Sequence, residues 1–78
     1  MSIESLREEI DKIDDKILEL FIKRMCIRNK ICEIKKANVI NLRDFNREKE
    51  IIDIVKKAAG QYAPAAESLF KFIVGLPL

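Results

Sequence analysis

The sequence contains no histidine and no tryptophan, and it has only two cysteines, two glycines and two prolines. Its cysteines, Cys26 and Cys32, form no CxxC pair, and without histidine the chain offers almost no ligands for a zinc site. Six residues apart on a helix, the two thiols do not face each other, so no disulfide is expected between them. We therefore predict two buried free thiols in a reducing compartment, and no metal.

Long apolar runs are also missing. No stretch approaches the roughly 20 apolar residues of a membrane helix, and residues 1–4 contain no apolar signal core. The 15 Lys and Arg residues are interleaved with 13 Asp and Glu residues, and the net charge is only +2. This balance argues against a nucleic-acid partner and against a membrane surface. We expect a soluble cytoplasmic protein.

The chain has 78 residues, which predicts a single domain over 1–78. A chain this short buries a modest fraction of its surface and often needs oligomerisation to complete a core.

One very long helix is predicted over about residues 5–36, a stretch without glycine or proline. Ser5–Glu8 fits a capping box at its start, and Ser2 is an earlier alternative cap. About 30 residues make a rod of about 45 Å, longer than a compact domain of this size can wrap by itself. Steps of three and four residues place one apolar stripe on a single face. The stripe consists of Ile3, Leu6, Ile10, Ile13, Ile17, Leu20, Ile27, Ile31 and Ile34.

A second apolar set begins at Leu18, so the middle of the rod is expected to be covered from two sides. The further members of this set are Phe21, Ile22, Met25, Cys26 and Cys32.

Two short helices complete an all-α fold. Asp44 is a good N-cap for a helix over about 45–59, and Gly60 suits its C-terminal end. Pro64 suits the first position of a third helix over about 64–75. The expected buried residues are Phe45, Ile51, Ile52, Val55, Ala58 and Ala59 in the second helix and Leu69, Phe70, Ile73 and Leu76 in the third.

Charged residues interrupt both apolar stripes. Arg24 stands in the stripe of the long helix and Glu48 in that of the second, where an unpartnered charge is costly. Lys35 follows Arg24 by eleven residues, so both point the same way, about 16 Å apart along the axis, and could hold a small anion between them. With Asp44, these side chains predict a polar pocket of two cations and two carboxylates.

Each of these residues also has a purely structural interpretation. Arg24 and Glu48 could form a buried salt bridge of little net stability. Lys35 could be a solvated residue at a helix C-terminus, and Asp44 only an N-cap. Arg7 could be a solvated first-turn residue. It lies 17 residues, or about 25 Å, before Arg24 and cannot share a small ligand with it in one chain.

In an antiparallel two-fold dimer with its axis near Leu18, the partner subunit's Arg7 would fall opposite residue 29, between Arg24 and Lys35.

Several segments together resemble the all-helical class of chorismate mutases, without a gap from about residue 3 to residue 58. The segments are Leu6–Asp14, Ile17–Phe21 with Arg24, Ile31–Lys35, Arg43-Asp44 and Arg47-Glu48. The resemblance implies an interlocked homodimeric bundle of three-helix protomers. It also implies the Claisen rearrangement of chorismate to prephenate, a step towards phenylalanine and tyrosine that needs no cofactor.

The resemblance further implies roles for individual residues. Arg24 and the partner subunit's Arg7 would clamp the substrate carboxylates, for which a guanidinium is better suited than an ammonium. Lys35 would reach a carboxylate and the ether oxygen, where negative charge grows. Glu48, with the backbone around Asp44, would take the ring hydroxyl.

The resemblance also has a less direct role for Arg47, which would orient Glu48. The C-terminus departs from the family, in which a serine and then a glutamine extend helix 3 towards the ether oxygen. Here Pro77 stands at the serine position and the chain ends at Leu78. Losing one such donor costs roughly a hundred- to a thousand-fold in rate. Gln61 is a replacement only by residue type.

The leading prediction is a homodimeric chorismate mutase, impaired if nothing replaces that glutamine. One alternative is a non-catalytic dimer of regulatory or interaction function. The other is a lyase on the same fold that removes pyruvate from isochorismate.

Overall fold

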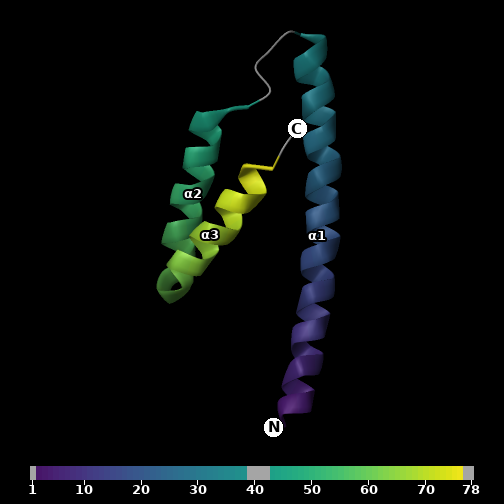
Figure 1. Ribbon diagram of the computed structural model, residues 1–78, viewed down its shortest axis with the longest axis vertical. Helices are drawn as coiled ribbons and strands as arrows, with labels where there is room; N and C mark the ends of the chain where they lie inside the picture. Colours follow the sequence, from purple (N-terminus) through teal and green to yellow (C-terminus); the bar gives the residue numbers. More distant parts are fainter. Residues whose placement is uncertain (1, 39–42, 77–78) are drawn as a thin grey trace. The chain divides into compact units, whose positions relative to one another are not determined.

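A computed structural model describes residues 2–38 and 43–76, and its regular elements there are all helical. Their order is α1 (Ile3–Ala37), α2 (Phe45–Ala59), the short 3-10 helix η1 (Gly60–Tyr62) and α3 (Ala63–Val74) (Figure 1). The all-α class and the three predicted α-helices are confirmed, whereas η1 was not predicted. The chain divides into two compact units, Met1–Asn38 and Val39–Leu78. The single domain over residues 1–78 stays a prediction.

The first unit is one uninterrupted helix, which begins earlier than predicted. Ser2 is the N-cap of α1: its Oγ accepts a hydrogen bond from the Ser5 backbone N–H at 3.1 Å. The Ser2 backbone N–H donates in return to the Ser5 Oγ at 3.2 Å, which completes a capping box. The predicted box over Ser5–Glu8 is therefore wrong, because the apolar stripe already starts at Ile3 and the cap lies just before it.

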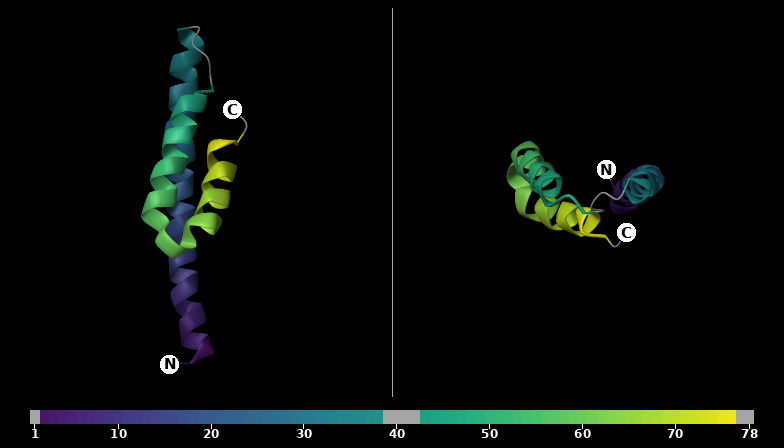
Figure 2. Two further views of the ribbon diagram at one scale, coloured as in Figure 1. Left: turned by 90° about the vertical axis from the view of Figure 1, so that its left-hand side faces the viewer. Right: turned by 90° about the horizontal axis from the view of Figure 1, so that it is seen from above.

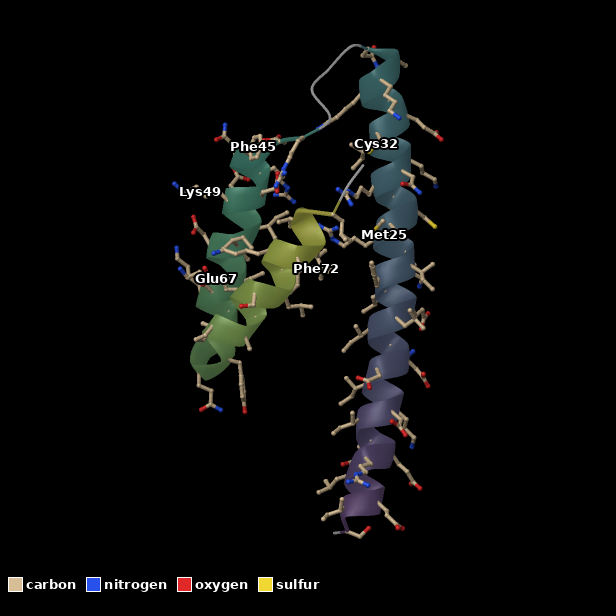
Figure 3. The ribbon with its side chains drawn as sticks, in the orientation of Figure 1. Met25, Cys32, Phe45, Lys49, Glu67 and Phe72 are labelled. Carbon is tan, nitrogen blue, oxygen red and sulfur yellow. The ribbon has the colours of Figure 1, made fainter. Side chains whose placement is uncertain are left out.

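At its other end, α1 stops at Asn38, whose side-chain Nδ2 donates to the Ile34 carbonyl at 2.8 Å. Lys35 and Lys36 lie in the last turn, where positive charge favours the helix C-terminus. The helix has 35 residues, which corresponds to about 52 Å. Figure 3 shows side chains projecting from α1 along its whole length.

The apolar stripe of α1 remains exposed. The exposed fraction of its isoleucines and leucines ranges from 39% at Leu6 to 69% at Ile3. Cys32 is buried, and among the described residues it is the only hydrophobic residue that is. Cys26 is exposed, so the prediction of two buried thiols is wrong for that residue. Their separation of six positions turns the helix by about 240°, which places the two thiols on different faces.

The second unit is a helical hairpin of α2 and α3, which lie beside each other in both views of Figure 2. Gly60 ends α2 with a φ of 57°, a left-handed conformation that suits glycine. From there η1 turns the chain directly into α3, which therefore begins at Ala63. Pro64 is consequently the second rather than the first residue of α3, where its missing N–H is still harmless.

Both helices of this hairpin carry half-buried apolar residues. They are Ile51, Ile52, Val55 and Ala59 from α2 and Ala63, Ala66, Phe70, Ile73 and Val74 from α3. Phe45, Ala58 and Leu69 are exposed, contrary to the predicted buried faces.

An ion pair also links the two helices of the hairpin. Lys56 Nζ on α2 lies 3.6 Å from Glu67 Oε2 on α3. Lys71 Nζ lies 2.9 Å from the other carboxylate oxygen of Glu67. The hydrogen bond from Lys71, with the nearby charge of Lys56, lowers the pKa of Glu67 below its ordinary value.

Candidate functional site

The three candidate cations of the first unit all lie on α1. Arg24 and Lys35 are half-buried, whereas Arg7 is exposed. Because α1 is helical from Ile3 to Ala37, Arg24 and Lys35 lie on one side of it, about 16 Å apart along the axis. The helical geometry that the spacing argument required is therefore present.

The same continuity separates Arg7 from Arg24. Their positions are 17 residues apart on an unbroken helix, which corresponds to about 25 Å. Within one chain, the two guanidinium groups therefore cannot bind the same small molecule. The contribution of Arg7 across a dimer interface stays a prediction.

In the second unit, Asp44 is the N-cap of α2. Its Oδ1 accepts a hydrogen bond from the Arg47 backbone N–H at 3.0 Å. Its backbone carbonyl accepts from the Glu48 N–H at 3.1 Å, the first bond of the helix. The structural role predicted for Asp44 is thus confirmed. This cap also fixes the turn of backbone from which Glu48 projects.

Glu48 is held by a residue that the sequence analysis did not single out. Arg43 Nε donates to Glu48 Oε2 at 2.8 Å, and Arg43 Nη2 donates to Glu48 Oε1 at 2.9 Å. The side chain of Glu48 is only 17% exposed, against 53% for Arg43. Two parallel charge-assisted hydrogen bonds fix the plane of a carboxylate as well as its charge. The Arg43–Glu48 pair is therefore the best-defined polar feature of this unit.

Arg43 has two further neighbours that restrict its side chain. Its guanidinium carbon lies 4.6 Å from the centre of the Phe45 ring, in a cation–π contact. A Cβ added at Gly75 would lie 3.9 Å from Arg43 Nη2, so the end of α3 approaches the guanidinium closely. The hydrogen bond to Glu48 raises the pKa of Arg43 above its ordinary value.

Two other polar residues of this unit lie apart from the Arg43–Glu48 pair. Arg47 Nη1 lies 3.6 Å from Glu50 Oε2, in an exposed ion pair of the kind that contributes little stability. Gln61 lies in η1, at the opposite end of α2 from Glu48. Glu48 and Ala59 are eleven positions apart on α2, which corresponds to about 16 Å of helix. Within one chain, Gln61 therefore cannot share a small ligand with Glu48.

The candidate residues thus come from both units. The structure brings Glu48 and Asp44 together on the first turn of α2 and aligns Arg24 with Lys35 on α1. A pocket that unites all four, and the pairing of Arg24 with Glu48, stay predictions. The spacing gave no signal for Arg43, because it stands five residues before Glu48 on the other side of the N-cap. That spacing is not one at which residues meet on a helix face.

Residues 2–38 and 43–76 contain no group of three or more Cys, Asp or Glu side chains that could hold a metal ion. No helix there is both long and apolar enough to cross a membrane.

Comparison with known proteins places these residues in context. Residues 6–76 match the family described as chorismate mutase type II. The chain is also 37% identical, over 57 residues, to a protein of Methanocaldococcus jannaschii named chorismate mutase. This similarity covers 73% of the chain and 58% of the relative, so the chain spans little more than half of that protein's length. No solved structure matches the chain significantly.

Proposed function

Because this chain belongs to the chorismate mutase type II family, we propose that it is an isomerase that rearranges chorismate to prephenate, towards phenylalanine and tyrosine. The family match carries the proposal, since its range contains every candidate site residue. These residues are Arg7, Arg24, Lys35, Asp44 and Glu48. The polar pattern within the range supports it, because the reaction binds a dicarboxylate and these positions supply three cations.

The reaction is a rearrangement within one molecule. The ether C–O bond breaks while a new C–C bond forms, and no proton or electron enters or leaves. The protein therefore needs neither a nucleophile nor a redox group. Its contribution is to hold the substrate in a compact chair and to stabilise the negative charge that grows on the ether oxygen.

In this proposal the cations do most of that work. Arg24 and the partner subunit's Arg7 bind the two carboxylates through forked guanidinium hydrogen bonds. Lys35 donates to a carboxylate and to the ether oxygen, so its ammonium group interacts more strongly with the transition state than with the substrate. Glu48 accepts the hydrogen bond of the ring hydroxyl, assisted by the backbone around Asp44.

The proposal includes a homodimer. The stripe of α1 exposes large apolar side chains over its whole length, including Ile10 at 54% and Ile17 at 56%. No large side chain in the described ranges is fully buried. Covering this stripe with a second copy of the chain would remove it from water, at about 25 cal/mol for each Å² of apolar surface. An antiparallel copy would also supply the second arginine that the substrate requires.

The test is the loss of chorismate with purified protein, with prephenate detected as the product. We expect turnover that falls about a hundred- to a thousand-fold in Lys35→Ala, because a charge-stabilising donor is lost. Lys30→Ala is the matched control: it removes the same charge from an exposed position of the same helix, about 140° around the axis. Pyruvate released from isochorismate would indicate the lyase instead. A folded protein that converts neither substrate would contradict the proposal.

A further inference from the structure

We propose that Arg43 is a positioning residue for Glu48: it orients the carboxylate that receives the substrate's ring hydroxyl. The inference rests on the proposed function, because it concerns the same site. The family resemblance assigned the orienting role to Arg47, but Arg47 forms an ion pair with Glu50. Arg43 instead binds both oxygens of Glu48, at 2.8 and 2.9 Å.

Arg43 restricts the conformations of the Glu48 side chain. A glutamate on the first turn of a helix can adopt several rotamers, most of which would aim its carboxylate away from a bound substrate. Both oxygens are engaged by a planar fork, so rotation about the last side-chain bond would break two hydrogen bonds at once. The two oxygens of a carboxylate together offer about four acceptor sites, and the fork of Arg43 uses two of them. Arg43 therefore orients Glu48 through both of its oxygens.

The side chain of Arg43 is itself restricted by its neighbours. The face of Phe45 lies 4.6 Å from its guanidinium carbon. Gly75, which ends α3, also lies near the guanidinium, since a Cβ added there would be at an ordinary van der Waals distance of 3.9 Å from Nη2. The guanidinium is thus restricted by the start of α2 and by the end of α3. An arginine held in this way loses little further freedom when substrate binds.

The positive charge of Arg43 also acts on the Glu48 carboxylate. A neighbouring cation favours the ionised form of a carboxylate, and the ionised form is the better acceptor for a hydroxyl. Arg43 remains positively charged at any pH at which the protein is folded. The pair therefore keeps Glu48 available as an acceptor towards acidic pH.

The kinetic experiment measures kcat/KM of the full chain for chorismate in four proteins: the wild type, Arg43→Gln, Glu48→Gln and the double variant. We expect Arg43→Gln to lower kcat/KM about ten-fold. In the Glu48→Gln background the same substitution is expected to change it less than two-fold, because Arg43 then has no carboxylate to orient. Equal losses in both backgrounds would overturn the proposal.

The control and a second measurement separate positioning from general effects. Lys49→Gln removes one positive charge from the residue next to Glu48, on the exposed first turns of α2 (labelled in Figure 3). We expect only Arg43→Gln to move the acidic limb of the pH–rate profile, by about one unit to higher pH. An unmoved limb in Arg43→Gln, or an equal shift in Lys49→Gln, would also overturn the proposal.

A third measurement does not depend on activity. The Nε–H group of Arg43 donates to Glu48, so its NMR signal is expected to be protected from exchange with water in the wild type and to lose that protection in Glu48→Gln. An Nε–H that exchanges equally fast in both proteins would refute the pair itself. If the wild type shows a protected Nε–H but does not convert chorismate, the proposed function is refuted, and so is the orienting role of Arg43. The Arg43–Glu48 pair itself would still be supported by that result.

Discussion

The exposed stripe of α1 provides a quantitative test of the proposed dimer. Ile13 lies near the middle of the N-terminal half of α1 and is 58% exposed. Full burial of an isoleucine side chain stabilises by about 1.5–3 kcal/mol, so covering what remains exposed contributes about 1–1.7 kcal/mol. Alanine retains part of this, and Ile13→Ala therefore loses about 1 kcal/mol in each subunit. Because a two-fold dimer contains the substitution twice, we expect about 2 kcal/mol weaker association, or about a 30-fold higher Kd.

Alanine is chosen because it has the highest helix propensity, so α1 remains helical. Asp15→Ala is the matched control: Asp15 is exposed on the same helix, about 200° around the axis from Ile13. Sedimentation equilibrium over a range of protein concentrations yields Kd for each protein, and circular dichroism checks the helix content. If Ile13→Ala and Asp15→Ala associate equally tightly, the stripe is not the dimer interface, and the sharing of Arg7 between subunits would lose its physical basis.

Three further predictions concern single side chains. Arg24→Lys is expected to lower kcat/KM for chorismate at least ten-fold, because an ammonium cannot form the two parallel hydrogen bonds of a guanidinium; near-normal kinetics would contradict the clamp. Mixing inactive Arg7→Ala with inactive Lys35→Ala chains is expected to restore part of the activity, because a heterodimer contains one intact site. No recovery after demonstrated subunit exchange would argue against a shared site. The pKa of Glu67 is lowered in the folded chain by Lys71 and Lys56. The ionised Glu67 therefore contributes to the free energy of unfolding above its ordinary pKa of 4.5, and this contribution is lost as the pH falls through the lowered pKa of the folded chain. Glu67→Gln is therefore expected to unfold more easily than the wild type near pH 7, and denaturant titrations are expected to show this difference shrinking as the pH falls below 4.5. A difference that does not depend on pH would refute the assignment.

The helices were predictable because their signals are local. The spacing of apolar residues along α1 and the cap at Asp44 depend on residues no more than four positions apart. Boundaries were less certain, because Ser2 and Ser5 both suit a helix start and only the hydrogen bonds distinguish them. Likewise, Gly60 marks the end of α2, but the sequence around it does not reveal that the 3-10 helix η1 follows.

The candidate site was predictable only in part. Arg24 and Glu48 stood out because each interrupts an apolar stripe, and this reasoning requires nothing beyond helical periodicity. Arg43 did not stand out, because it lies in the connection before α2, outside both apolar stripes. Its importance comes from three neighbours on two elements: Glu48, Phe45 and Gly75.

By itself, the sequence determined that this chain is helical, where its helices lie to within about two residues, and that Arg24 and Lys35 share one side of α1. These properties follow from backbone hydrogen bonds and side-chain directions that repeat every 3.6 residues. The tertiary structure alone decided that Arg43 holds Glu48 and that the end of α3 returns to this pair. That decision depends on the folding of the α2–α3 hairpin, which brings Gly75 to a residue 32 positions earlier in the chain. No local pattern in a sequence encodes such a distance.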